Sequence, residues 1–199
     1  MDYYLETPAS ESEIRQLKIG DSVHISGTII TARDEAHRKA LKLNDKGEKL
    51  PVDFDGLGVF HCGPIMRKMC NEWEVVAAGP TTSARMENFE DKFIQAFRPA
   101  IIIGKGGMGE RTENACAEYG CVYCVFTGGA ALLSARGIKQ VIDVFWLDEL
   151  GMPECLWVFK VEDFGPLIVT IDSCGNNMTE NVKRRVSAKM QEVLASLDD

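Results

Sequence analysis

The sequence predicts an α/β fold with a mixed sheet and βαβ units. Beyond Trp73, β-rich segments alternate with helical segments of about ten residues, and this order is typical of parallel strands joined by helical crossovers. Two extended stretches, 156–163 and 167–173, follow with no helix between them, which indicates that some strands are antiparallel. Because domains usually contain roughly 100–200 residues, residues 1–199 are expected to form a single domain.

The first elements are predicted from capping and spacing. Ser10 and Glu13 form a capping-box pattern that opens a short helix, and β-branched residues predict a strand over 23–31. Residues 32–43 carry apolar side chains at helical spacing, and Asp34 is expected to cap this helix. A strand-to-helix junction is therefore predicted near residue 32.

The later elements are predicted from the alternation itself. The last helix carries Val182, Val186, Met190 and Leu194 four residues apart on one face. The remaining expected strands are 74–79, 100–104, 121–126 and 140–146, and the expected helices are 87–97, 110–119, a short one after Gly128 and one from about Thr179.

Composition excludes several classes of function. The formal net charge is −8, which disfavours binding to nucleic acid or anionic lipid. The acidic amino-terminal segment lacks the features of a signal peptide, and no window holds about 18 uninterrupted apolar residues. A soluble, cytoplasmic protein without membrane segments is expected.

The seven cysteines predict reduced thiols, because an odd number without an export signal is untypical of a disulfide framework. Cys121 and Cys124 form a CxxC within an apolar, β-rich run, and no second CxxC accompanies it. Buried structural thiols are the favoured interpretation. His24 and His61 have no neighbour at metal-ligand spacing and are interpreted as structural.

Two loops have the composition of anion sites. Residues 79–85, GPTTSAR, lie between a predicted strand and helix and offer backbone N–H groups, hydroxyls and the guanidinium of Arg85. Residues 104–109, GKGGMG, combine flexible glycines with the charge of Lys105. A helix cap and a tight turn explain these loops equally well. Because GKGGMG also fits the GxGxxG pattern, a nucleotide site stays an alternative.

A third candidate is the helix start near residue 33. Arg33 and His37 lie four residues apart and would share one helix face, with Asp34 able to orient either side chain. A solvated helix face is the commoner explanation of such a pattern. The pattern alone does not separate the two.

Six ordered motifs resemble one family over nearly the whole chain. The segments GTIITARDEAH, FHCGPI, GPTTSARME, GKGGMG, ELGMPE and VEDFGPLIVTID resemble the beta subunit of L(+)-tartrate dehydratases and class I fumarate hydratases. HCGPIMRK and the segment around GPTTSARMENFEDKFI are more similar to the tartrate dehydratase branch.

The resemblance implies a swivelling β/β/α domain and a hydro-lyase that dehydrates a small hydroxy-dicarboxylic acid, L(+)-tartrate to oxaloacetate, or alternatively interconverts malate and fumarate. It also implies a partner alpha subunit that holds a 4Fe-4S cluster, in an alpha2-beta2 heterotetramer active only when complete. One iron would act as a Lewis acid on the leaving hydroxyl. No cofactor or metal is expected on this chain.

The matching motifs also imply roles for single residues. Arg33, Thr82, Arg85 and Lys105 would bind the substrate's carboxylates, and Thr81 and His37 would be catalytic, with Thr81 transferring a proton. Two hypotheses compete with this one. The chain could be a nucleotide-binding module built on GKGGMG, or a non-catalytic assembly subunit that docks through these loops and the last helix.

Overall fold

The computed structural model describes residues 1–70, 72–126 and 131–195 and has mixed α/β architecture, as the sequence predicts. The strands are β1 (Asp2–Thr7), β2 (Ser22–Thr31), β3 (Gly58–Phe60), β4 (Ile65–Met69), β5 (Glu72–Ala77), β6 (Ile101–Gly104), β7 (Val122–Val125), β8 (Ile138–Phe145) and β9 (Leu156–Ile171). The helices are α1 (Glu11–Ile14), α2 (Asp34–Asp45), the 3-10 turn η1 (Ser83–Arg85), α3 (Glu87–Phe97), α4 (Glu110–Tyr119), α5 (Ala131–Gly137), α6 (Leu147–Leu150) and α7 (Met178–Ala195).

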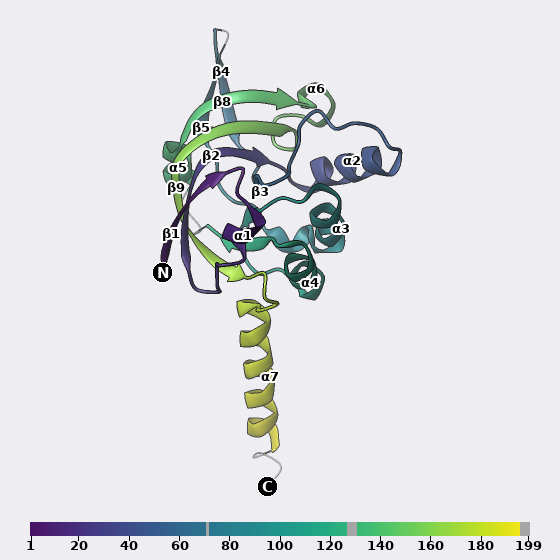
Figure 1. The fold of residues 1–199 in the computed structure, drawn as a ribbon, viewed down its shortest axis with the longest axis vertical. Helices are drawn as coiled ribbons and strands as arrows, with labels where there is room; N and C mark the ends of the chain where they lie inside the picture. Colours follow the sequence, from purple (N-terminus) through teal and green to yellow (C-terminus); the bar gives the residue numbers. More distant parts are fainter. Residues whose placement is uncertain (71, 127–130, 196–199) are drawn as a thin grey trace.

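The main sheet has the strand order β1-β2-β3-β6-β7-β9-β8. The neighbours from β1 to β7 are parallel, whereas β9 runs antiparallel to both β7 and β8. Because β9 also pairs with β2, the pairings β2–β3–β6–β7–β9 return to β2 and close a circuit of strands. Figure 1 shows this strongly curved sheet, with α2, α3 and α4 side by side against one part of it.

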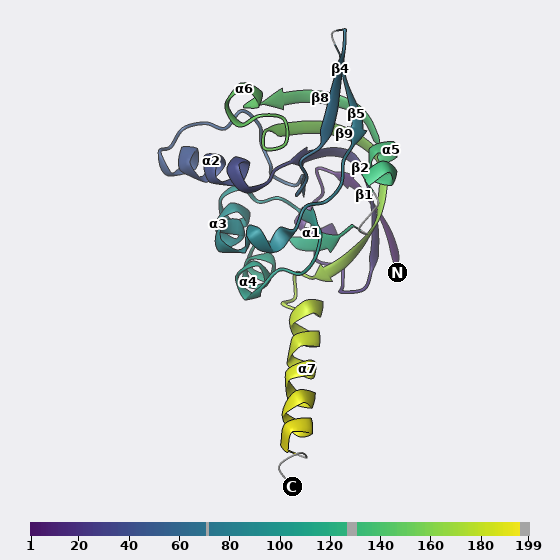
Figure 2. The same cartoon turned by 180° about the vertical axis from the view of Figure 1, so that it is seen from behind.

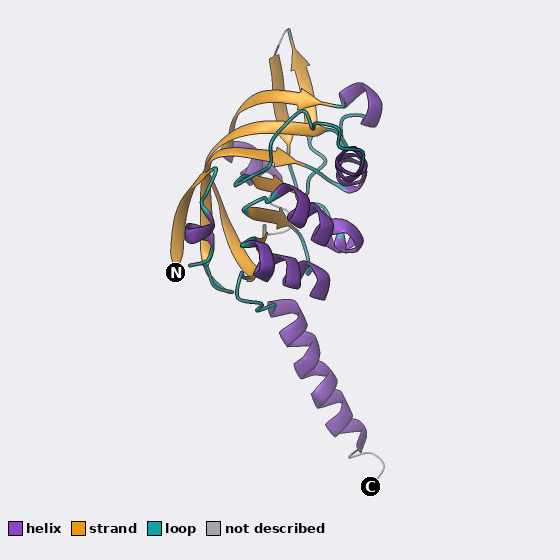
Figure 3. Cartoon of the chain, turned by 45° about the vertical axis from the view of Figure 1, so that its right-hand side comes forward, coloured by secondary structure: helices purple, strands orange, loops and turns teal. Residues whose placement is uncertain are grey.

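Alternate residues of the parallel strands point to two different cores. On β6, Ile101 and Ile103 belong to one buried cluster and Ile102 to the other, as expected from the two-residue period of a strand. The second cluster also contains Phe93 and Ile94 of α3, so it fills the space between sheet and helices. Figure 3 shows the helices gathered beside the strands.

The capping box at Ser10 and Glu13 is confirmed, and the helix that it opens ends at Ile14. The predicted cap at Asp34 is wrong. The N-cap residue of α2 is Arg33, no side chain caps the helix, and the Asp34 carboxylate instead faces two arginines. The ion pairs of Asp34 with Arg33 and Arg85 therefore take the place of the expected helix cap.

The two extended stretches near the carboxyl end form one strand, β9, rather than two. Asp163 adopts a positive φ of 51° in its middle, and the pairing with β2 shifts register near there. The strand nevertheless continues, because Phe164 pairs with Ile25 and Leu167 with Val23. Because β2 pairs with β9 on both sides of Asp163, the segment that looks like a loop in the sequence is part of the strand.

Strands β1 and β4 are among the elements that were not predicted from the sequence. The first is β1, an edge strand that pairs in parallel with β2. The second is β4, which pairs with β5 in a hairpin that projects from the end of the molecule opposite α7 (Figures 1 and 2). Strand β5 overlaps the expected strand 74–79. In β1 exposed residues alternate with half-buried or buried ones, whereas Met66 is the one buried residue of β4, so β4 lacks the apolar alternation of a half-buried strand.

Helix α7 extends away from the body (Figures 1 and 2). Val182, Val186 and Met190 lie on it as predicted, and each is exposed; the side chain of Leu194 and the start of the segment after Gly128 lie outside the described residues. No helix among the described residues combines the length and apolarity needed to cross a membrane.

All seven cysteines are free. Cys121 and Cys124 are buried, as the sequence predicts, and so are Cys62, Cys116 and Cys155. Burial raises the pKa of the Cys124 thiol above its usual range, and it raises that of Cys155 to about 12. These thiols are therefore protonated at neutral pH.

Candidate anion-binding site at the carboxyl edge of the parallel strands

The candidate site lies where three parallel strands end. Thr31, Phe60 and Ile103 are neighbours in register on β2, β3 and β6. Each of these strands is followed by a polar loop, so Arg33 and Lys105 leave the sheet at the same edge. Ligands of α/β proteins commonly bind at this edge, outside the carboxyl ends of the strands.

Arg33 is held between two carboxylates. Its Nε lies 2.9 Å from Glu154 Oε1 and 3.8 Å from Asp34 Oδ2, and all three side chains are about one-fifth exposed. Gly63 makes room for it, because a Cβ at that position would lie 2.6 Å from Arg33 Nη1. The glycine of the HCGP segment therefore allows the guanidinium to lie against the loop.

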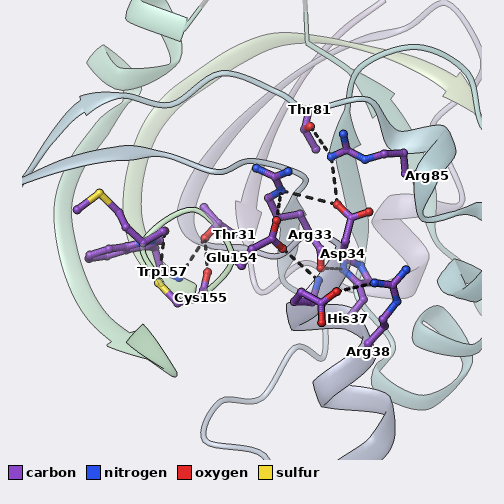
Figure 4. A network of polar contacts seen from close by, with 12 residues as sticks. Thr31, Arg33, Asp34, His37, Arg38, Thr81, Arg85, Glu154, Cys155 and Trp157 are labelled. Atoms are coloured by element: carbon purple, nitrogen blue, oxygen red, sulfur yellow. Dashed lines mark hydrogen bonds and ion pairs between the residues drawn. The ribbon is translucent and has the colours of Figure 1, made fainter. Parts of the chain in front are cut away.

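Arg85 connects the GPTTSAR loop to the start of α2. Its Nη2 donates to Thr81 Oγ1 at 2.9 Å and to Asp34 Oδ2 at 3.1 Å (Figure 4). Partial burial acts to raise the pKa of Asp34, but its own backbone amide and the charges of Arg85 and Arg33 outweigh this effect and lower it. Asp34 is thus an ionised carboxylate between two guanidinium groups.

Lys105 and Thr82 lie side by side on two loops. They form an isolated parallel bridge, the amide of Ser83 donates to the Lys105 carbonyl at 3.0 Å, and the amide of Lys105 donates to Ser83 Oγ at 3.2 Å. The side chains of Lys105 and Thr82 are exposed, and no carboxylate of the described chain pairs with Lys105. Its positive charge therefore faces solvent.

His37 lies behind this surface rather than on it. Its side chain is fully buried, and its Nε2 lies 3.5 Å from Glu90 Oε2. His61 is equally buried, with its Nε2 3.2 Å from the same oxygen. His61 has no partner at metal-ligand spacing in the sequence, but α3 brings Glu90 to it from a distant part of the chain.

The end of the GKGGMG loop is already filled. The Glu87 carboxylate accepts hydrogen bonds from the Gly109 amide at 2.7 Å, the Thr112 hydroxyl at 2.7 Å and the Arg111 amide at 3.1 Å. It therefore occupies the start of α4, where a phosphate would otherwise bind. This arrangement disfavours a nucleotide at that loop.

Sequence reasoning missed three residues of this region. Glu154 pairs with Arg33, Glu90 lies between the two histidines, and Ser83 joins His61 to Lys105. Glu154 belongs to the ELGMPE motif, which was a usable signal. Nothing in the local sequence distinguishes Glu90 from the other acidic residues of its helix.

Fold and site together define a mixed α/β protein with three basic side chains in the loops at the carboxyl edge of its parallel strands. Arg33, Arg85 and Lys105 come from three separate loops to one edge of the sheet. The profile of the Fumarase C-terminus family matches residues 2–182, and the chain belongs to this family.

The relatives agree with this assignment over almost the whole chain. A Methanocaldococcus jannaschii protein, provisionally named L(+)-tartrate dehydratase subunit beta, is 44% identical over 191 residues, covering 96% of this chain and 98% of its own length. The Escherichia coli K12 L(+)-tartrate dehydratase subunit beta is 39% identical over 197 residues, covering 99% and 96%. A Geobacillus stearothermophilus protein, provisionally named class I fumarate hydratase, is 41% identical over 94% of this chain but only 35% of its own length.

Proposed function

We propose that this chain is the beta subunit of a hydro-lyase that dehydrates a small hydroxy-dicarboxylic acid, with L(+)-tartrate as substrate and oxaloacetate as product. The observation that carries the proposal is the cationic edge itself: Arg33, Arg85 and Lys105 meet there, in a chain similar from end to end to beta subunits of that name. Two carboxylates on a short substrate need at least two such cations.

Arg33, Thr82, Arg85 and Lys105 bind the substrate's carboxylates in this proposal. Arginine offers the paired N–H groups that match a carboxylate, and lysine adds a point charge. Asp34 already occupies one such position between Arg33 and Arg85, which supports the geometry for a carboxylate. The same cations stabilise the charge that develops when the carbon beside a carboxylate loses its proton.

Thr81 transfers this proton in our proposal. A hydroxyl is a poor base unless its ionised form is stabilised. Arg85 Nη2 donates to Thr81 Oγ1 at 2.9 Å, which favours an ionised oxygen. His37, the second catalytic candidate, is fully buried, and we assign it a supporting role instead of contact with the substrate.

The iron-sulfur cluster of this enzyme type does not fit the residues of this chain. Five of its thiols are buried and Cys70 and Cys174 are exposed, and the group of three possible metal ligands among the described residues, formed by His37, His61 and Glu90, contains no cysteine. We therefore assign the 4Fe-4S cluster to an alpha subunit, in an alpha2-beta2 assembly. The free thiols support a cytoplasmic location, and the curved mixed sheet with α2, α3 and α4 beside it supports a swivelling domain formed by residues 1–199.

The test is anaerobic co-expression with the alpha subunit, followed by assays with L(+)-tartrate. Arg85→Ala should lower kcat/KM by about 10- to 100-fold, because a charge-assisted contact is worth roughly 1.5–3 kcal/mol. Arg15→Ala is the matched control, since Arg15 is similarly exposed and also pairs with a carboxylate, that of Glu11 at 2.7 Å. Equal activity of both variants would refute the assigned site.

The second candidate is a class I fumarate hydratase beta subunit, favoured by the similarity to the Geobacillus protein. Comparing kcat/KM for L(+)-tartrate, malate and fumarate on one complex decides between the two. Turnover of malate and fumarate without tartrate would replace the first candidate. A complex inactive on all three would refute both.

A further inference from the structure

Three fully buried ionisable side chains meet behind the candidate site. His37 comes from α2, His61 from the end of β3, and Glu90 from α3. Both Nε2 atoms approach Glu90 Oε2, at 3.5 Å and 3.2 Å, and among the described residues neither these nitrogens nor the Glu90 oxygens have another hydrogen-bond partner. The ring centroids of Phe93 and His37 lie 4.3 Å apart, so an apolar side chain packs directly against this group.

The partners of the two Nδ1 atoms indicate which ring nitrogen carries a hydrogen in each histidine. His37 Nδ1 is 2.9 Å from the carbonyl oxygen of Arg33, which can only accept, so this nitrogen carries a hydrogen. His61 Nδ1 is 2.9 Å from Ser83 Oγ, which already accepts from the Lys105 amide. The Ser83 oxygen has a second lone pair and could also accept from Nδ1, but His61 Nε2 lies 3.2 Å from Oε2 of the Glu90 carboxylate, which accepts hydrogen bonds. We therefore place the His61 hydrogen on Nε2, with the Ser83 hydroxyl donating to Nδ1.

The inner contacts then require one further proton. His61 Nε2–H points to Glu90 Oε2, but His37 Nε2 faces the same carboxylate without a hydrogen of its own. One proton shared between His37 and Glu90 satisfies this contact and leaves the buried group neutral overall, which burial strongly favours. Burial lowers the pKa of His61, and the two imidazoles lower that of Glu90 to about 2 against the effect of burial.

A metal ion is the competing occupant, because two imidazoles and a carboxylate are suitable ligands. Closed structural zinc sites use four protein ligands, and the described residues supply only these three. A proton shared between His37 and Glu90 explains the contacts of the three side chains without requiring a fourth ligand.

We propose that the His37–Glu90–His61 triad is a positioning device that holds all three substrate-binding loops by their backbones. His37 holds the Arg33 carbonyl, the His61 carbonyl accepts from the Thr81 amide at 2.7 Å, and His61 reaches the Lys105 amide through Ser83. This inference rests on the proposed function, because it assigns the triad to the same site.

Gly104 supports this assignment independently. A Cβ at Gly104 would collide with Ser83 Oγ and lie 3.2 Å from His61 Nδ1. The first glycine of GKGGMG is thus needed to bring the Ser83–His61 link against β6, not to approach a phosphate.

The kinetic test uses the complex with the alpha subunit. Glu90→Gln should lower kcat/KM by about 100-fold, because a displacement of about 1 Å can have an effect of this size. Ser83→Ala removes the hydroxyl that joins His61 to the Lys105 amide. It should therefore raise KM, while kcat changes less than about threefold. Asp172→Asn is the control, since Asp172 is a fully buried carboxylate at the opposite edge of the sheet. Wild-type kinetics for both Glu90→Gln and Ser83→Ala would overturn the proposal.

The second test is ¹⁵N NMR of the histidine rings in the full chain, which contains only three histidines. We expect His61 with its hydrogen on Nε2, His37 with a hydrogen on Nδ1, and a slowly exchanging proton between His37 and Glu90 that Glu90→Gln removes. A hydrogen on His61 Nδ1, or one equivalent of bound metal in the purified protein, would overturn the proposal. Because this readout needs no substrate, it separates failure of the triad from failure of the proposed function.

Discussion

Lys105 is the site residue whose charge is least compensated within the chain. Its side chain is exposed and has no carboxylate partner among the described residues, unlike Arg33 and Arg85. Lys105→Ala should therefore change the free energy of unfolding by less than about 0.5 kcal/mol while raising KM about 10- to 100-fold through a lost charge-assisted contact. Urea unfolding and steady-state kinetics measure the two effects. A large loss of stability with unchanged KM would show that the lysine serves the fold.

His61 should make stability depend on pH. Burial lowers its pKa below the usual 6.5, so below that pH the unfolded chain binds a proton that the folded chain does not. The contribution of His61 to the free energy of unfolding should therefore be fully present above its unfolded pKa of about 6.5 and be lost progressively as the pH falls below it. His61→Gln keeps an Nε2 donor but cannot titrate, so its urea midpoints should depend less on pH. Parallel curves for wild type and variant would contradict this account.

At the scale of single elements, Glu87 has a structural role that the neighbouring motif hides. Its carboxylate caps α4 through the Gly109 and Arg111 amides and the Thr112 hydroxyl. Glu87→Ala should destabilise the protein by about 1–2 kcal/mol, the usual effect of losing a cap. Glu110→Ala is the control, because Glu110 is exposed in the first turn of the same helix. Thermal unfolding checks both, and equal melting temperatures would show that the cap contributes nothing.

The apolar face of helix α7 does not pack against the rest of the described chain. The spacing of Val182, Val186 and Met190 is that of a helix face buried against a partner, yet each of these side chains is more than half exposed. The family match also ends at residue 182. Spacing predicts the helix correctly, but it contains no information on what lies beside it.

At the scale of the whole molecule, β9 joins the parallel and antiparallel parts of the sheet. Trp157 on this strand is fully buried, packs at 5.1 Å against Trp73, and donates its indole N–H to the Met152 carbonyl. Trp157→Ala should cost about 3–5 kcal/mol, as expected for a large aromatic removed from a core. Tyr4→Ala, at an aromatic residue that is 75% exposed, should cost under about 1 kcal/mol. Urea unfolding measures both, and similar losses would refute the central role of β9.

Much of the fold follows from local patterns in the sequence. The strands β2, β6 and β7 and the helices α3 and α4 were predictable because buried strands and amphipathic helices have periods of their own. The strands β1 and β4 were not predicted, and β4 has one buried residue among its five, so the two-residue period is absent there. Asp34 was expected to cap α2 because a sequence pattern indicates only hydrogen bonds to residues nearby in the chain. The structure instead brings its carboxylate to Arg33 and Arg85.

By itself, the sequence determined the chemistry of the candidate site: two arginines, a lysine and hydroxyls in loops that follow strands. Only the tertiary structure decided how these residues relate to one another. It set Asp34 between Arg33 and Arg85, turned His37 inward, and brought Glu90 to His61. The physical reason is that parallel strands align their carboxyl ends through pairing between distant segments, and the side chains that pack behind that edge depend on the same long-range contacts.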